Sequence, residues 1–153
     1  MKALPYLLTL ALATLLAACG ATQNHSTVTQ GVTGTVTWLE GNQMPSVGSD
    51  NGKTSAKPVV RTLHFYQPAE DGDARQANGF YANVSTKLVA KTTSDEAGNF
   101  AIKLPPGKYS VFIEEADGLW ANRFDGQGHI NPVTVTAGQT TTLNIKIDYK
   151  AFY

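Results

Sequence analysis

The chain has only one cysteine, Cys19, and no excess of charge of either sign. A single thiol excludes a disulfide within the chain, so the fold must be stabilised by its hydrophobic core. Twelve basic residues balance twelve acidic ones, which excludes the strongly basic surface typical of nucleic-acid binding and of polybasic membrane contact. We therefore expect no nucleic-acid partner.

Helical periodicity is also lacking. After residue 18, no window of 11 residues or more has apolar residues at the spacing of an amphipathic helix. Short stretches of alternating apolar and polar residues occur instead, separated by Gly, Pro, Asn and Asp. This pattern predicts an all-β protein folded as a sandwich of several short strands.

The first 18 residues have the layout of an export signal. Lys2 lies near the start, residues 7–16 form an apolar run, and Ala17 and Ala18 follow. The run is too short to span a bilayer, which takes about 20 residues. We therefore interpret residues 1–18 as a cleaved signal peptide.

The segment Leu16-Ala17-Ala18-Cys19 resembles a bacterial lipobox. The resemblance implies cleavage before Cys19 and acylation of its thiol, whereas the alternative is a free cysteine after an ordinary signal. Two or three acyl chains hold a protein at a membrane without a spanning helix, because each buried methylene contributes ~0.8 kcal/mol. Position 20 is Gly and not Asp, which by resemblance to lipoprotein sorting rules favours the outer membrane. The domain would then face the periplasm, with surface exposure as the alternative.

Residues 21–30 are small and polar and have no apolar period. Such a composition is typical of a flexible tether. We therefore expect a signal peptide at residues 1–18, a tether at 19–30 and one β-sandwich domain at 31–153, with the membrane as a partner through the N-terminal lipid.

The clearest strand pattern lies in residues 92–115. Apolar residues alternate on either side of Pro105-Pro106-Gly107, first at residues 100, 102 and 104 and then at residues 109, 111 and 113. This alternation predicts two antiparallel strands that form a β-hairpin, with Gly107 in a left-handed corner. Residues 95–99 have the composition of a turn, with Asp95 able to accept backbone hydrogen bonds and Gly98 able to adopt a positive φ.

Further strands are predicted on both sides of this hairpin. Residues 59–66 are apolar on both faces, so we expect a central strand. Residues 40–58 and 68–83 are predicted as long polar loops, and residues 116–131 as a connection with at most one short strand. The other predicted strands are residues 31–38, 84–92, 132–136 and 141–149.

Several motifs together resemble the carboxypeptidase regulatory-like domain. They are Gly31-Val32-Thr33-Gly34-Thr35-Val36, residues 93–100 and Leu104-Pro105-Pro106-Gly107-Lys108-Tyr109. The resemblance covers about residues 31–149 and implies a transthyretin-like (prealbumin-like) Greek-key β-sandwich of seven or eight strands. Residues 40–45 and 124–133 also resemble lipoproteins of Bacteroidetes-type bacteria. These resemblances imply a fold and a location, and no activity.

Metal and cofactor sites are not predicted. His25, His64 and His129 fall in the tether, a strand and a loop, without the spacing of metal ligands. We interpret His64 as an ordinary residue of a sheet. Glu70, Asp71 and Asp73 lack the ligand pattern of a calcium loop.

Catalysis is not predicted either, because no specific nucleophile, histidine and carboxylate can be brought together from the sequence. Comparison with related enzymes leads to the same expectation. Transthyretin-like hydroxyisourate hydrolases end in Tyr-Arg-Gly-Ser, whereas this chain ends in Lys150-Ala151-Phe152-Tyr153. The two Tyr and two His iron ligands of intradiol dioxygenases have no counterpart cluster. We therefore expect no enzyme activity.

One loop combines aromatic and planar polar side chains suited to sugar or peptide recognition. The candidate ligand surface comprises Trp120, Arg123, Phe124, Asp125 and His129. The alternative is that the two aromatic rings cap the end of the sandwich and that Asp125 begins a turn. Trp38 is expected in the core. The sequence thus favours a lipid-anchored envelope module with a structural or protein-binding role, with carbohydrate binding by the 120–129 loop as the alternative.

Overall fold

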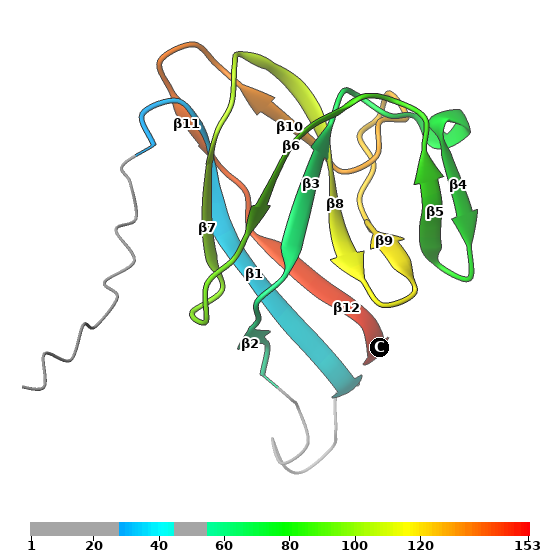
Figure 1. Cartoon of the computed structure of the whole chain (residues 1–153). Coiled ribbons are helices and arrows are strands. Elements are labelled where there is room, and N and C mark those ends of the chain that lie inside the picture. Colours follow the sequence, from blue (N-terminus) through cyan, green and yellow to red (C-terminus); the bar gives the residue numbers. More distant parts are fainter. Residues whose placement is uncertain (1–27, 45–54) are drawn as a thin grey trace, which may run out of the picture.

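The computed structural model describes residues 28–44 and 55–153 (Figure 1). The signal peptide, Cys19 and His25 therefore lie outside the described residues. In the described part, twelve strands form two sheets, and helical structure is confined to one 3-10 turn, η1 (Asp71–Asp73). The predicted all-β sandwich is confirmed. The strands outnumber the expected seven or eight because several are segments of only two to four residues.

The first sheet is built on one long strand, β1 (Gly31–Asn42). On one side β1 pairs in antiparallel orientation with β7 (Asn99–Lys103) and β2 (Lys57–Pro58). On the other side it pairs in parallel orientation with β11 (Thr140–Thr142) and β12 (Ile145–Phe152). The two ends of the described chain therefore lie in neighbouring strands.

The second sheet is centred on β8 (Gly107–Glu115). Its strand order is β4-β5-β9-β8-β3-β6, and β10 also pairs with β8. The other strands are β3 (Thr62–Tyr66), β4 (Ala74–Ala77), β5 (Phe80–Val84), β6 (Leu88–Thr93), β9 (Gly118–Trp120) and β10 (Pro132–Val135). The predicted central strand is confirmed, although it begins at Thr62, because β3 lies between β6 and β8.

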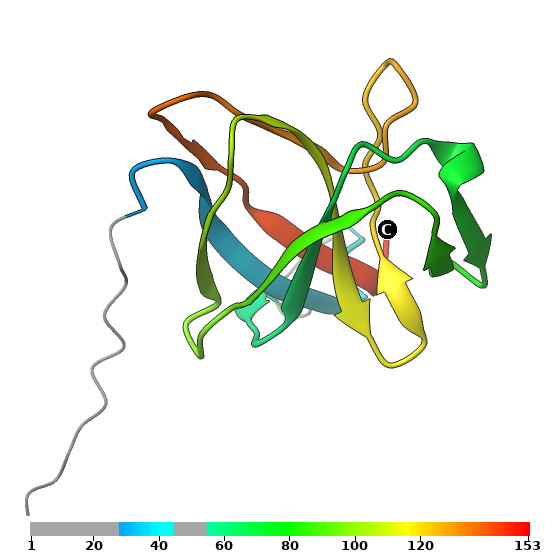
Figure 2. The same cartoon turned by 45° about the horizontal axis from the view of Figure 1, so that its top comes forward.

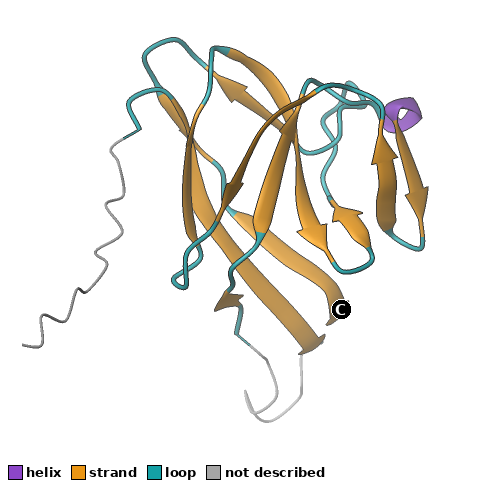
Figure 3. Ribbon diagram, viewed as in Figure 1, coloured by secondary structure: helices purple, strands orange, loops and turns teal. Residues whose placement is uncertain are grey.

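Two apolar clusters hold the sheets. The main core lies between them and takes the alternating residues of both, including Val32, Phe100, Val111 and Ile147. A smaller cluster around Phe112 lies on the outer face of β8, where residues of the β4–β5 hairpin and of the β9–β10 connection cover it. Figure 3 shows the β4–β5 hairpin at one margin of the molecule. The second sheet is thus covered on both faces near β8.

The predicted hairpin in residues 92–115 is wrong, although both of its strands exist. Strand β7 pairs with β1, whereas β8 pairs with β3, β10 and β9 in the opposite sheet (Figure 2). Pro105 and Pro106 have no N–H, which disfavours a tight hairpin ladder, and the chain crosses between the sheets there instead. Gly107, predicted in a left-handed corner, has a positive φ of +157°, which residues with a Cβ rarely adopt, but it is the first residue of β8 and not the corner of a hairpin.

The predicted turn at residues 95–99 is present. The Asp95 carboxylate accepts a hydrogen bond from the Asn99 N–H at 2.8 Å, and Gly98 has φ +78°. This turn also joins strands of different sheets, β6 and β7. Local turn chemistry therefore fixed the turn but not the strand partners.

Residues 68–83 are not the continuous loop that was predicted, because they contain β4 and most of β5. The two strands are joined by Asn78 and Gly79, with φ +53° and +84°. Positive φ at both central residues is typical of the type I′ turn that Asn-Gly favours. The sequence therefore carried a hairpin signal that the polar composition obscured.

Two predicted strands are interrupted. The strand predicted over residues 84–92 is interrupted at residues 85–87, between β5 and β6, where the Lys87 C=O accepts the Gln67 N–H at 2.9 Å. The strand predicted over residues 141–149 is interrupted at Leu143 and Asn144, between β11 and β12. At this second interruption the Asn144 side chain takes the place of a backbone acceptor, because its Oδ1 accepts the N–H of Thr35 at 3.2 Å.

The structure also differs from the predicted limits at both ends of β1. The strand continues to Asn42, so the loop predicted from residue 40 starts later and contains β2. At the other end, Gln30 donates to the Leu104 C=O at 3.0 Å and accepts from Gly138 N at 2.9 Å. Val28 accepts a hydrogen bond from the Thr140 hydroxyl. Residues 28–30, assigned to the tether, therefore pack on the sandwich.

Candidate functional site

The β9–β10 connection contains a compact loop centred on Asp125. The Asp125 N–H donates to the His129 C=O at 3.1 Å, and Gly128 N–H donates to the Asp125 C=O at 3.2 Å. Asp125 Oδ1 accepts the N–H groups of Gln127 and His129, both at 2.9 Å, and Oδ2 lies 2.8 Å from His129 Nδ1. Asp125 thus organises the loop, as the turn interpretation predicts.

The hydrogen bonds at Asp125 favour its charged form. Partial desolvation acts to raise the pKa of Asp125, but the amides of His129 and Gln127 and the His129 ring lower it from 3.8 to about 2. A carboxyl group whose pKa is lower in the folded state stabilises the fold above its unfolded pKa, and this stabilisation is lost as the pH falls through the folded pKa.

We expect the Asp125→Asn variant to unfold at a lower temperature than wild type at pH 7, because the charged acceptor is lost. The difference in Tm should shrink as the pH falls from about 4 to about 2, the window between the unfolded and folded pKa. Thermal unfolding of both chains across this range measures it. A difference that stays constant from pH 5 to pH 2 would contradict this role of the carboxylate.

The structure brings together four of the five predicted surface residues. Arg123, Phe124, Asp125 and His129 share the loop, where Phe124 is 54% exposed and Arg123 Nε donates to Asn131 Oδ1 at 3.2 Å. Trp120 is the exception, because only 3% of it is exposed and it belongs to the main core. It occupies an inward-facing position of β9, opposite Ile113. The prediction of Trp120 as a surface ligand group is therefore wrong.

An open groove of about 740 Å³ lies beside this loop. Three chain segments line it: residues 67–68 after β3, residues 85–87 with Val89 around the start of β6, and residues 106–109 at the start of β8. Lys108 connects groove and loop, since its Nζ donates to Gln127 Oε1 at 3.2 Å and lies 3.7 Å from Asp125 Oδ2. The lining includes Lys87 and Lys108 and no carboxylate.

The groove also contains a free piece of strand edge at Lys108. Successive residues of a strand direct their N–H and C=O groups to opposite edges. Val111 donates its N–H to the Asn131 C=O, toward the β10 side. Lys108 and Ser110 lie an odd number of residues from Val111, so their backbone groups point to the other edge of β8, toward β3.

Strand β3 ends before it reaches Lys108. Its last residue, Tyr66, lies opposite Ser110. Continuation of this register would place Pro68 opposite Lys108, and proline has no N–H to donate. The ladder stops there, which leaves the N–H and C=O of Lys108 directed into the groove.

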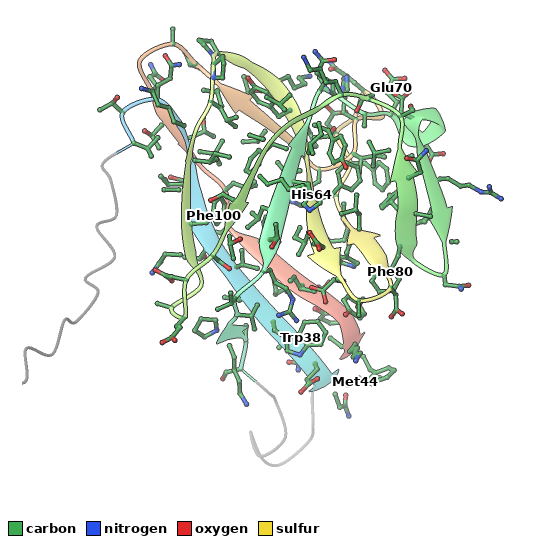
Figure 4. All side chains as sticks on the ribbon, viewed as in Figure 1. Trp38, Met44, His64, Glu70, Phe80 and Phe100 are labelled. Atoms are coloured by element: carbon green, nitrogen blue, oxygen red, sulfur yellow. The ribbon has the colours of Figure 1, made fainter. Side chains whose placement is uncertain are left out.

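A second cluster of aromatic residues lies at the opposite end of the sandwich. Tyr149 contacts Trp38 and Phe80 edge to face, at centroid distances of 5.1 and 5.0 Å (Figure 4 labels both partners). Its hydroxyl donates to Glu115 at 3.0 Å, and Glu115 pairs with Arg61 at 2.7 Å. Burial and the Glu115 carboxylate raise the pKa of Tyr149 to about 12.

This cluster closes the end of the core. Trp38, expected in the core, is half-buried and packs against it. The Arg61 and Lys150 side chains lie 5.8 and 5.7 Å from the centre of its ring, which leaves less of the ring for a ligand. We therefore regard this cluster as structural.

His64 and the acidic residues near η1 have structural contacts. His64 is buried in the second sheet, and its Nε2 lies 2.7 Å from Glu114 Oε2; this hydrogen bond and the nearby ring lower the pKa of Glu114. Asp73 Oδ2 accepts the Glu70 N–H at 3.0 Å, at the start of η1. Within residues 28–44 and 55–153, no three His, Cys, Asp or Glu side chains are grouped as metal ligands would be.

No helix within the two described ranges, residues 28–44 and 55–153, is long and apolar enough to cross a bilayer.

The groove residues were not predicted, since they come from three separate segments. The sequence does contain residues that could have indicated the groove. Pro68 and Pro106 interrupt β-ladders, and Lys87 and Lys108 supply its charge. Their proximity depends on which strands are neighbours, and the sequence pattern does not give this.

Comparison with known proteins identifies one family. No curated protein and no solved structure gives a significant match. A family model, the carboxypeptidase regulatory-like domain, matches residues 75–148, which run from β4 to β12. Domains of this family are generally non-catalytic β-sandwich modules. The resemblance to this family that the motifs in residues 93–109 carry is thus confirmed over residues 75–148, slightly less than half of the chain.

Proposed function

We propose that the protein is a lipid-anchored, non-catalytic module of the cell envelope that binds an extended segment of a partner protein in the groove. The observation that carries the proposal is the free edge of β8 at Lys108, inside a groove of about 740 Å³. A peptide that adds to a strand edge gains backbone hydrogen bonds, while nearby side chains select its sequence.

The charges of the groove indicate the chemistry of the partner. Lys87 and Lys108 line it without a carboxylate in the lining. Asp125, outside the lining, lies 3.7 Å from Lys108 Nζ and partly balances that charge, whereas Lys87 forms no ion pair among the described residues. Complementary charges steer encounter and favour one partner over another. We therefore expect an extended segment with acidic side chains.

The anchor rests on the sequence alone. The lipobox-like segment ending at Cys19 favours acylation, and eight residues, 20–27, lie between Cys19 and Val28. Even fully extended, the nine steps from Cys19 to Val28 span at most about 32 Å. Gln30 contacts the end of the sandwich at Leu104, close in sequence to the groove residues 106–109. The groove would therefore meet partners close to the membrane.

The arrangement of the histidines supports a non-catalytic role. His64 pairs with Glu114 and His129 pairs with Asp125. Among the described residues, no hydroxyl group has a hydrogen bond to either ring, so neither pair has the nucleophile that a hydrolytic triad requires.

Carbohydrate binding by the loop is the second candidate. The observation in its favour is Phe124, an exposed ring beside Arg123 and Asp125. Trp120 is buried in the core, so of the two rings, Trp120 and Phe124, only the smaller one lies on this surface. Loss of glycan-array binding in Phe124→Ala, with groove variants unaffected, would favour this candidate.

Charge reversal in the groove tests peptide binding. We expect an extended probe of alternating Thr and Glu to bind the unlipidated Cys19→Ala chain, and the Lys87→Glu, Lys108→Glu double variant to lose at least tenfold in affinity. Lys91→Glu with Lys103→Glu is the matched control, since neither residue lines the groove. Titration calorimetry measures the affinities. Equal losses in both double variants would mean that net charge and not the groove determines binding.

A further inference from the structure

We infer that a second, smaller pocket, between the β9–β10 connection and the start of β12, binds a carboxylate group. The pocket has a volume of about 150 Å³, room for a carboxylate and its neighbouring atoms but not for an oligosaccharide. Its lining residues are Asn122, Arg123, Asn131, Asn144, Ile145 and Lys146. This site is separate from the groove and does not depend on the peptide proposal.

Asn144 directs donors into this pocket. Its Oδ1 accepts hydrogen bonds from the N–H and the hydroxyl of Thr35, at 3.2 and 3.1 Å. Since the two ends of a carboxamide point in different directions, this contact fixes the side chain and turns the NH₂ group away from Thr35. Two N–H donors therefore remain for a ligand.

Arg123 is held in place by a buried amide. Asn131 is only 2% exposed, and its Nδ2 donates to the Val111 C=O at 2.7 Å. Its Oδ1 in turn accepts from Arg123 Nε at 3.2 Å. The two terminal nitrogens of the guanidinium group are not used in this contact, and they form the planar pair of donors that matches a carboxylate.

The charge of the pocket is positive. Arg123 and Lys146 contribute two positive charges, and no lining residue is acidic. The nearest carboxylate, Asp148, lies 3.9 Å from Lys146 Nζ, but its oxygens accept hydrogen bonds from Asn122 Nδ2 at 3.1 Å and from the Tyr153 hydroxyl at 3.0 Å. One positive charge therefore remains to balance an anion.

This set of groups offers many donors and few acceptors. The side-chain oxygens of Asn131 and Asn144 accept from protein donors, so among the lining side chains only the Asn122 oxygen remains to accept from a ligand hydroxyl. An ionised carboxylate accepts hydrogen bonds and carries the complementary charge. A uronic acid and the C-terminus of a peptide both present this group.

NMR titration of the unlipidated Cys19→Ala chain tests the pocket through the side-chain N–H signals of Arg123 and Asn144. The probes are sodium glucuronate and N-acetyl-alanyl-alanine, at constant ionic strength. Their neutral counterparts are glucose and the peptide amide. We expect saturable shifts with at least one acid and none with its neutral counterpart. Saturation by only one acid supports the proposal and identifies the source of the carboxylate.

Variants make the assignment specific. Asn144→Asp keeps the acceptor for Thr35 but replaces the donors by a negative charge, so we expect at least a tenfold loss of affinity. Arg123→Gln should also weaken binding tenfold, whereas Arg75→Gln, an equal loss of charge on β4, and the groove variant Lys87→Glu should not. The proposal is overturned if neither acid saturates, if a neutral counterpart binds equally, or if both pocket variants retain wild-type affinity.

Discussion

Replacement of Gly34 by alanine is expected to destabilise the sandwich by about 3 kcal/mol or more, at the upper end of the cost of overpacking a core. A Cβ atom at this position would lie 1.8 Å from the Leu143 C=O oxygen and 2.6 Å from its carbon. Both are backbone atoms, so no side chain can rotate away. The two neighbouring strands must separate.

The position explains the size of the effect. Gly34 lies opposite the break between β11 and β12, where the Leu143 N–H donates to the Thr33 C=O at 2.8 Å and Asn144 contacts Thr35. Separation of the strands would therefore break the pairing that joins the last strands to β1.

Thermal and urea unfolding of Gly34→Ala measure this cost, and we expect Tm to fall by roughly 10 °C or more. Gly126→Ala is the control, because nothing lies within 4 Å of a Cβ built there, and surface changes of this kind stay within about 0.5 kcal/mol. Equal stability of the two variants would refute the close approach at Gly34.

Replacement of Cys19 by alanine is expected to abolish both palmitate incorporation and membrane association. The chain has no other cysteine, so the variant has no thiol to acylate. Two or three acyl chains give stable anchoring, whereas a single chain gives only marginal and reversible binding. Loss of all of them should therefore shift the protein almost completely into the soluble fraction.

Metabolic labelling with radioactive palmitate, followed by membrane fractionation, measures both effects. Ser26→Cys in the Cys19→Ala background is the control, because it restores a thiol outside the lipobox-like segment and should not restore the label. A wild-type chain without label, or a Cys19→Ala chain that stays on the membrane, would contradict the anchor.

Much of the fold could be predicted because burial leaves a local signal. Alternation marked Val32 and Val36 in β1 and the inward residues of β7 and β8, and these are buried. The turn at residues 95–99 was also predicted correctly, since Asp95 and Gly98 act on their own backbone.

Strand partners could not be predicted in the same way. A residue such as Phe100 shows by its spacing that it faces a core, but not whether the strand beside it is β8 or β1. The hairpin predicted in residues 92–115 was wrong for this reason, because the strand nearest in sequence was taken as the neighbour in space.

The candidate site was predicted only in part for related reasons. Asp125 and His129 are close in sequence and their contact is local, whereas Lys108 and Pro68 become neighbours only through the register of β3 and β8. Trp120 was named as a candidate because it shares a glycine-rich loop with planar polar groups, with burial at the end of the sandwich as the alternative. Its place in β9 turns it inward.

The measurement that tests the central proposal most directly is the NMR signal of the Lys108 backbone amide during titration with the alternating Thr-Glu peptide. We predict a saturable downfield shift of this amide and slowed hydrogen exchange, because its N–H gains a backbone acceptor when a strand adds to β8. The amide of Tyr109 faces the other edge of β8, toward β10, and should shift less. Binding that leaves the Lys108 amide unchanged, or no binding at all, would contradict the account.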